Sequence, residues 1–275
     1  MMNATITNSH LANPRLARSR PPSMLSRTGT ILLVAAVALL LAGCGDSSYN
    51  WGWYIFNPFL PRGASNIQFM LAGLGLTISL SILAICVSVV LGVLLALAGL
   101  SKNGLLRGLN RVYVECFRAV PMLVLLLWVY YGLPVLTGLQ FGAFTAGLMT
   151  LAISDSAFEA EVFRAGIQSV PRGQSEAAET LGLSRWMTFR YIVFPQAIRH
   201  ILPALGNQFV YVLKMSSLVS VIGLQELTRR SNELNVTEYR PLEIYTLLVF
   251  EYLALILVVS WGVRRLERRL AYGRR

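Results

Sequence analysis

The residues of this 275-residue chain that could do catalytic chemistry are few and scattered. Its two histidines, His10 and His200, lie on different segments, and no HExxH pattern or Cys/His cluster with metal-ligand spacing occurs. The GxxxxGK[ST] pattern that cradles nucleotide phosphates is also missing from the sequence. We therefore expect no catalytic residue, no metal site and no cofactor bound by this chain.

Charged residues inside apolar segments are the remaining candidates for chemistry, because a lysine at the centre of a membrane helix costs about 2.5–3.5 kcal/mol. Lys214 lies in the middle of such a segment. It could face a substrate pathway together with Ser216, Ser217 and Glu251, and there bind a substrate carboxylate. Alternatively it could pair with Glu251, since the two depths differ by only roughly 5 Å at 1.5 Å per residue. Both interpretations remain open from the sequence.

Asp155 and Glu159 are two further acidic residues in an apolar segment, four apart and hence on one helix face. We expect them to pair with arginines of the adjoining loops rather than to line the pathway. Arg118, beside Pro121, receives the same structural interpretation.

The elements that must position these residues are membrane helices. Hydrophobic residues make up 55% of the chain and charged residues 13%, with a mean hydropathy of +0.58, whereas soluble domains carry about 25% charged residues. Uncharged runs of 18, 39 and 36 residues follow Arg27, Arg62 and Arg118, and roughly 20 apolar residues cross a bilayer. This composition excludes a disordered chain, a coiled coil and an ordinary soluble enzyme, and predicts an all-α, polytopic transmembrane bundle.

Five core helices are expected, at residues 71–100, 112–131, 142–163, 203–224 and 244–263. Gly132, Pro134, Gly138 and Gly142 interrupt the 36-residue run and predict the turn of a hairpin there. Gly92, near Ala96 and Gly99, could allow close helix packing.

The net charge of +11 reflects topology. Nineteen of the 24 basic residues lie in four alternate segments, 1–27, 101–118, 164–199 and 264–275. Short basic loops stay in the cytoplasm, so we expect both termini inside and no nucleic-acid partner.

The predicted organisation is a basic cytoplasmic tail (1–27), an apolar segment (28–45), a periplasmic segment (46–66), a transmembrane domain (67–268) and a basic tail (269–275). Cys44 follows Leu41, Ala42 and Gly43 in a context like a bacterial lipoprotein signal, so 28–45 is either an uncleaved extra N-terminal helix, which we favour, or a signal that ends at a lipidated cysteine.

The loop 164–199 is much longer than a helix connection needs. Ser175 is expected to cap a short helix with Glu176 and Glu179 in its first turn, and Gly182 to end it. Ala177, Ala178 and Leu181 would form a small apolar face. That face could dock another protein or lie on lipid headgroups.

The same loop resembles a known family pattern. Glu176-Ala177-Ala178, three residues, Gly182, nine residues and Ile192-Val193-Phe194-Pro195 are similar to the EAA loop of ATP-binding cassette (ABC) importer permeases, with Phe194 as a departure. Flanking segments around Phe117-Arg118, Arg164-Ala165-Gly166 and Lys214-Met215-Ser216-Ser217 resemble the polar amino acid uptake branch, which serves histidine, glutamate, glutamine and arginine. The resemblance covers about residues 70–268 and looks closest to glutamate/aspartate permeases.

The resemblance implies the fold and partners of a type I importer in the inner membrane of a bacterium. Two permease subunits, identical or homologous, would form the pathway, two copies of a separate ATPase would consume ATP, and an external binding protein would deliver a polar or acidic amino acid. Glu176, Ala177, Ala178 and Gly182 would form the helix that couples to the ATPase. An ion-gradient-driven transporter or channel is the alternative, although no internal repeat of the kind common in such folds is visible.

Overall fold

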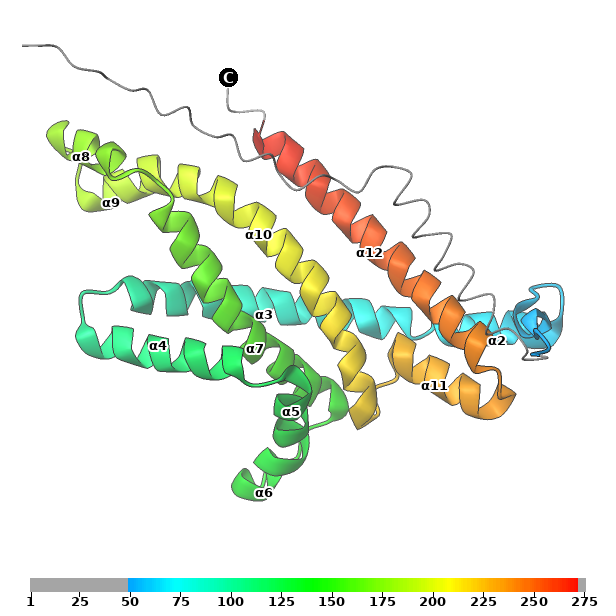
Figure 1. Cartoon of the computed structure of the whole chain (residues 1–275). Coiled ribbons are helices and arrows are strands. Elements are labelled where there is room, and N and C mark those ends of the chain that lie inside the picture. Colours follow the sequence, from blue (N-terminus) through cyan, green and yellow to red (C-terminus); the bar gives the residue numbers. More distant parts are fainter. Residues whose placement is uncertain (1–48, 272–275) are drawn as a thin grey trace, which may run out of the picture. The chain divides into compact units, whose positions relative to one another are not determined.

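The computed structural model describes residues 49–271, and every regular element in this range is a helix. Four long helices dominate Figure 1: α3 (Leu74–Leu100), α7 (Ala143–Gln168), α10 (Phe194–Met215) and α12 (Pro241–Ala271). The shorter elements are η1 (Trp53–Phe56), α2 (Pro61–Leu71), α4 (Gly104–Ala119), α5 (Met122–Leu127), η2 (Trp128–Gly132), α6 (Leu133–Thr137), α8 (Arg172–Thr180), α9 (Arg185–Thr188), η3 (Phe189–Val193), η4 (Ser216–Ile222) and α11 (Leu227–Glu238). The all-α class is thus confirmed. The predictions for residues 1–45 and Cys44 lie outside the described residues.

Three stretches of the described chain are long and apolar enough to cross a membrane: Pro61–Leu100, Arg185–Ile222 and Pro241–Arg268. A fourth candidate is the pair Gly104–Ala119 and Met122–Thr137, which meet at 102°. The helix α7, which was expected to span, is not among them, and it carries buried Asp155 and Glu159.

The prediction of a single helix over 112–131 is wrong. The chain breaks between α4 and α5, where Val120 is extended (φ −81°, ψ 126°) and Pro121 precedes the first residue of α5. Proline has no N–H and disfavours helical conformation in the residue before it. The hairpin turn predicted after this region is present, since Gly138 ends α6 with φ +73° and α7 begins at Ala143.

The prediction that a helix begins at Pro203 is also wrong. Helix α10 begins at Phe194, directly after the π-helix η3, and contains Pro203 in its interior. At its other end α10 tightens into the 3-10 helix η4, which ends at Gly223. Helix α11, which begins at Leu227, is not apolar and was not predicted from the sequence.

The most extensive helix contact joins α3 to α7, and small residues make it possible. Of the seven buried positions on α3, six are small or hydroxyl-bearing and only Leu80 is large, whereas the side chains of Leu83, Val87, Val90 and Leu94 are exposed. The six are Thr77, Ser81, Ala84, Ser88, Gly92 and Ala96. A methyl group added at Gly92 would clash with Cβ of Glu159 on α7 and lie 3.2 Å from the Ala160 nitrogen. Membrane helices pack in this way because small residues let their backbones approach closely. The close approach expected at Gly92 is therefore present.

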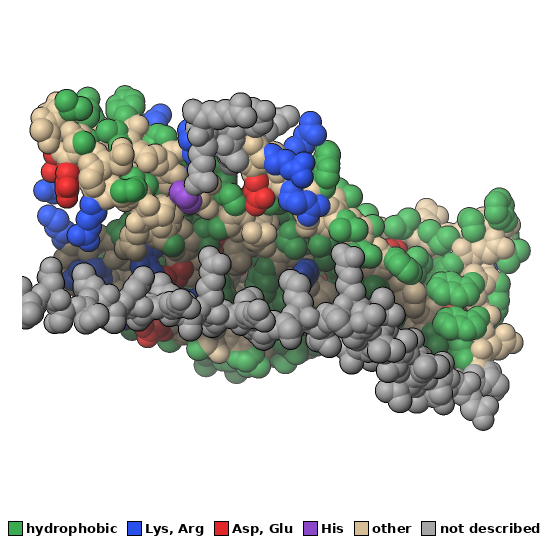
Figure 2. Space-filling view, turned by 45° about the horizontal axis from the view of Figure 1, so that its top comes forward, with side chains coloured by type: hydrophobic (Ala, Val, Ile, Leu, Met, Phe, Trp, Pro, Cys, Tyr) green, Lys and Arg blue, Asp and Glu red, His purple; other side chains and the backbone are tan. Residues whose placement is uncertain are grey.

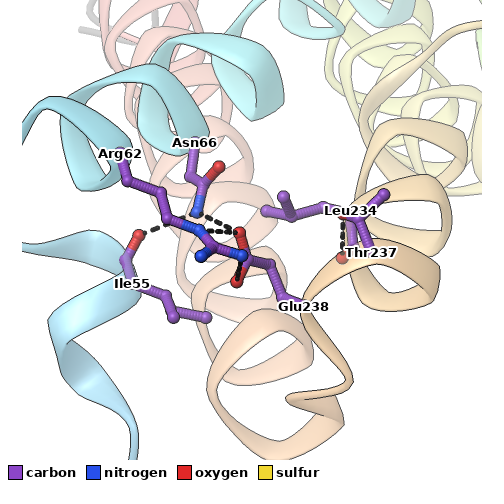
Figure 3. A network of polar contacts seen from close by, with 6 residues as sticks. All are labelled: Ile55, Arg62, Asn66, Leu234, Thr237 and Glu238. Carbon is purple, nitrogen blue, oxygen red and sulfur yellow. Dashed lines mark hydrogen bonds and ion pairs between the residues drawn. The ribbon is translucent and has the colours of Figure 1, made fainter.

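A polar network joins η1 and α2 to the end of α11 (Figure 3). Arg62 donates from Nε and Nη2 to the two carboxylate oxygens of Glu238, each at 2.9 Å. Asn66 Nδ2 donates to Glu238 Oε1 (3.0 Å) and to the carbonyl of Ile55 (3.1 Å). Two-point contact of this kind fixes orientation as well as distance, so the network holds the segment before α3 against α11.

The start of α11 is fixed by a second buried acid. Glu226 accepts hydrogen bonds from the Arg229 N–H (2.7 Å) and the Tyr252 hydroxyl (3.0 Å). It therefore caps α11 and links it to α12. Burial raises the pKa of the Glu226 carboxyl.

The α3–α7 contact yields a stability prediction. Gly92→Ala should lower the free energy of unfolding by about 1–3 kcal/mol, because added volume in a close-packed contact displaces its neighbours. Thermal unfolding of the detergent-solubilised permease measures the change. Gly75→Ala on the same helix is the matched control, since nothing lies within 4 Å of its added methyl group. Equal Tm values for the two variants would contradict the importance of this contact.

Candidate functional site

The segment with the EAA pattern forms a helix whose end is built from backbone hydrogen bonds. The Gly182 N–H donates to the Glu179 carbonyl (2.9 Å) and the Leu183 N–H to the Ala178 carbonyl (3.1 Å). This pair of bonds is a Schellman motif, which requires a left-handed residue, and Gly182 has φ +78°. The expected termination at Gly182 is confirmed.

The expected cap at Ser175 is wrong. Helix α8 begins at Arg172, after Pro171, and no side chain caps it. Pro171 occupies the N-cap position with φ −59° and ψ 135°, and the helix begins one turn earlier than its acidic residues suggested.

The small apolar face expected on α8 is divided between two sides. Ala178 is 1% exposed and lies inside the loop's own packing, whereas Ala177 is exposed and Leu181 is 81% exposed. Glu176 and Glu179 are exposed as well. A partner protein can therefore touch Ala177 and Leu181, while Ala178 supports the loop from within.

A cavity of about 620 Å³ lies behind α8, where the end of α7, α9 and η3 meet it. Its walls include Arg172, Glu179, Arg185 and Phe189, together with Thr188. The Thr188 hydroxyl is buried and has no hydrogen-bond partner. The loop thus presents an exposed helix, α8, with a partly polar cavity on its inner side.

Helices α8 and α9 and the α3–α4 connection (residues 101–103) lie at one end of the described chain (Figure 1). We call this end the basic end. On the face shown in Figure 2, Lys and Arg side chains gather toward this end. None is visible at the opposite end, where hydrophobic side chains dominate. The distribution agrees with the charge asymmetry between alternate loops in the sequence.

Lys214 is exposed at the end of α10, and no ion pair joins it to Glu251 among the described residues. Glu251, on α12, has one carboxylate oxygen buried without a hydrogen-bond partner. The alternative in which these two residues form a structural pair is therefore not realised within this chain.

The two serines that follow Lys214 donate their hydroxyl hydrogen bonds to backbone carbonyls. Ser216 is fully buried and donates to the Leu213 carbonyl (2.8 Å), and Ser217 donates to the Lys214 carbonyl (2.8 Å). Such bonds to preceding carbonyls compete with the helix ladder, and α10 changes to the 3-10 helix η4 at this point. Ser216 consequently presents no free surface within this chain.

The expectation that Asp155 and Glu159 pair with arginines is wrong. Asp155 accepts hydrogen bonds from the hydroxyl of Ser88 (2.6 Å) and from Nε2 of Gln208 (2.9 Å), so it joins α3, α7 and α10. Glu159 is fully buried against Gly92, and neither carboxylate oxygen has a hydrogen-bond partner. The nearby arginines are occupied otherwise: Arg164 binds Glu161, and the Arg118 guanidinium lies 5.2 Å above the Phe158 ring. Charge spacing alone did not reveal that the partners of Asp155 are neutral.

Comparison with known proteins gives a family for the chain. Residues 88–272 match the family described as "Binding-protein-dependent transport system inner membrane component". The glutamine transport system permease protein GlnP of Escherichia coli (strain K12) is 37% identical over 205 residues, which cover 74% of this chain and 94% of that protein. The probable amino-acid ABC transporter permease protein YckA of Bacillus subtilis (strain 168) is 35% identical over 226 residues, 82% of this chain and 98% of that protein.

Solved structures agree with the sequence comparisons. A chain from the crystal structure of an amino acid ABC transporter with histidines has a TM-score of 0.72 and 40% identity, and covers 75% of this chain and 96% of its own. The methionine transporter MetNI, in an inward-facing conformation, gives a TM-score of 0.65 at 18% identity over 75% of this chain and 98% of its own, which shows the shared fold.

The type I importer permease fold is therefore confirmed, and the alternative of an ion-gradient-driven transporter falls away. The match over 88–272 includes α8, the cavity behind it and the Lys214 region. This chain belongs to the family of binding-protein-dependent transport system inner membrane components and is a permease subunit of an amino acid ABC importer.

Proposed function

We propose that this permease imports a polar amino acid by alternating access, with two copies of a separate ATPase docked at the basic end. A second permease subunit, identical or homologous, would complete the pathway, and an external binding protein would deliver the substrate at the opposite end. The observation that carries this proposal is the exposed, backbone-capped α8 at the position of the EAA pattern. The basic end would face the cytoplasm, because short basic loops are retained there.

The coupling role of α8 rests on its exposed residues. Glu176, Ala177 and Leu181 are open to a partner, and the Schellman motif at Gly182 fixes the angle at which the chain leaves the helix. Ala178 packs inward, toward η3 and α9, so displacement of α8 would be passed to the start of α10. This continuity suits a helix that relays movement of an ATPase to the membrane part.

Two substrate classes are favoured by different observations. The entry segment near Trp51–Phe56 and the last helix look like glutamate/aspartate permeases, which favours an acidic amino acid. The Escherichia coli relative is a glutamine transport system permease, which favours glutamine. Every α-amino acid carries a carboxylate, which exposed Lys214 could bind in either case. Ser217 and Glu251 belong to the same proposed pathway.

The function is tested by uptake into proteoliposomes that hold the permease with its ATPase. We expect labelled glutamate, aspartate or glutamine to accumulate only when ATP is present on the side of the membrane that carries the ATPase. The binding protein must also be present on the opposite side. Accumulation driven by a sodium or proton gradient without ATP would contradict the proposal. A panel of the three amino acids with one binding protein at a time decides the substrate class.

The coupling proposal predicts that Leu181→Asp weakens retention of the ATPase roughly tenfold, as expected for a charge placed at a buried interface position. Co-purification of the ATPase with tagged permease measures this effect. Val236→Asp is the matched control, because Val236 is an exposed aliphatic residue of α11 at the opposite end. Ala178→Glu should instead disturb the loop itself and lower permease stability. Full ATPase retention by Leu181→Asp would exclude this face of α8 from docking.

The pathway proposal predicts that Lys214→Met lowers uptake by about one to two orders of magnitude, because a charge-assisted hydrogen bond contributes about 1.5–3 kcal/mol. Initial rates of labelled substrate uptake, with ATPase retention measured in parallel, test this expectation. Lys102→Met, at an exposed lysine in the α3–α4 connection, serves as the control. Glu251→Gln should have a smaller effect. Unchanged uptake by Lys214→Met with full ATPase retention would exclude Lys214 from the pathway.

A further inference from the structure

A second cavity, of about 420 Å³, lies at the basic end between α3, α4 and α7. Helix α4 supplies most of its wall through residues three, four or seven apart, which share one helix face. These are Arg107, Asn110, Arg111, Val114, Glu115 and Arg118. The mechanism proposed above makes no use of this cavity.

The cavity is lined mainly by cations. Four arginines and two glutamates contribute, which leaves two positive charges in excess. Glu161 holds Arg164, and Phe158 lies beneath Arg118. The other two arginines, Arg107 and Arg111, are exposed, and within residues 49–271 the structure shows no hydrogen bond or ion pair for either. Two guanidinium groups, one turn apart, are therefore available to an anion.

Asn110 adds a polar group that also requires a partner. Its side-chain oxygen is buried and has no hydrogen-bond partner, while its amide nitrogen lies close to Gly99 of α3. An unsatisfied buried acceptor costs about 1–3 kcal/mol. A hydroxyl group that enters the cavity between Arg107 and Arg111 could donate to this oxygen.

The outer face of α4 indicates what kind of anion fits. Leu105, Leu109 and Val112 are 60–70% exposed, so α4 is apolar on one side and basic on the side that lines the cavity. A soluble anion would use only the basic side. An anionic phospholipid would use both, with its headgroup among the arginines and its acyl chains along the apolar side.

We propose that this cavity binds the phosphate-bearing headgroup of an anionic phospholipid. Arg107 and Arg111 bind the phosphate, and Asn110 accepts from a headgroup hydroxyl, such as that of phosphatidylglycerol. The headgroup occupies the cavity between α3, α4 and α7, beside the end of α7 that leads into α8, and the acyl chains lie along the apolar side of α4. It is a structural ligand of the permease, distinct from the transported amino acid.

Native mass spectrometry of the full-length, detergent-solubilised permease tests the proposal. The probes are phosphatidylglycerol, phosphatidylcholine and inorganic phosphate, each added at increasing concentration. Arg107→Gln/Arg111→Gln removes the two free guanidiniums at nearly constant volume. Arg264→Gln/Arg268→Gln is the matched control, since it removes the same charge from exposed positions of α12 that lie outside the cavity.

We expect wild type and the control to retain phosphatidylglycerol equally and phosphatidylcholine far less. The cavity variant should bind phosphatidylglycerol at least about tenfold more weakly, because each basic residue near an anionic headgroup contributes measurably to binding. Asn110→Leu should weaken phosphatidylglycerol more than phosphatidic acid, which lacks the glycerol hydroxyls. Unchanged lipid binding by the cavity variant would overturn the proposal. Displacement of the lipid by millimolar inorganic phosphate would overturn it in favour of a soluble anion, and equal binding of phosphatidylcholine would also overturn it.

Discussion

The packing of α3 against α7 is the contact on which the rest of this structure depends. Inside a bilayer, lipid chains are as apolar as leucine, so helices gain little from burying large apolar side chains against each other. Van der Waals contact and interhelical hydrogen bonds must hold them together instead. Gly92 lets the two backbones approach, and the Ser88 hydroxyl reaches Asp155 across the contact. Large side chains of α3 such as Leu83, Val87, Val90 and Leu94 are left exposed, although Leu80 is fully buried.

This arrangement explains why a helix as polar as α7 can lie at the centre. Asp155 meets neutral donors from α3 and α10, and Glu159 is enclosed by the close approach at Gly92. The neighbouring helix α10 and, beyond it, α12 lie in stretches that qualify as membrane spans, whereas α7 does not. Helix α7 then leads directly into the loop with α8, so the most tightly packed element is also the one nearest the proposed ATPase contact.

Two kinds of feature could be predicted from the sequence. They are the apolar segments that favour the membrane over water, and the turns and helix ends that depend on the backbone conformation of glycine. The uncharged run after Arg62 predicted α3, and the observed end of this helix at Leu100 agrees with the prediction. The glycines between residues 132 and 142 predicted the turn before α7. Gly182 was identified correctly as the end of α8. The break at Pro121 was missed because the apolar run continues through it, although the proline itself carried the signal. The earlier start of α10 was missed because the residue composition does not change between η3 (Phe189–Val193) and the first turns of α10. No composition signal therefore marks Phe194 as a helix start.

Side-chain partners were less predictable, because charge and spacing do not define which neighbours a side chain meets. Asp155 was expected to meet a cation and meets Ser88 and Gln208. The face of α8 was inferred from residue type alone, and only the packing of η3 and α9 distinguishes buried Ala178 from exposed Ala177. The EAA pattern located the candidate coupling segment by resemblance, whereas Lys214 was identified by the energetic penalty of its position.

The length of α3 has a mechanical consequence. Its 27 residues extend about 40 Å at 1.5 Å per residue, and the hydrocarbon layer is about 30 Å thick. A helix longer than this layer is accommodated by tilting, by kinking or by local thickening of the bilayer. If α3 is tilted, a change in bilayer thickness changes its tilt angle and so moves its ends parallel to the membrane plane. The amino-terminal end of α3 follows α2, which the Arg62–Glu238 ion pair joins to α11. This end would therefore shift laterally when the membrane thins or thickens.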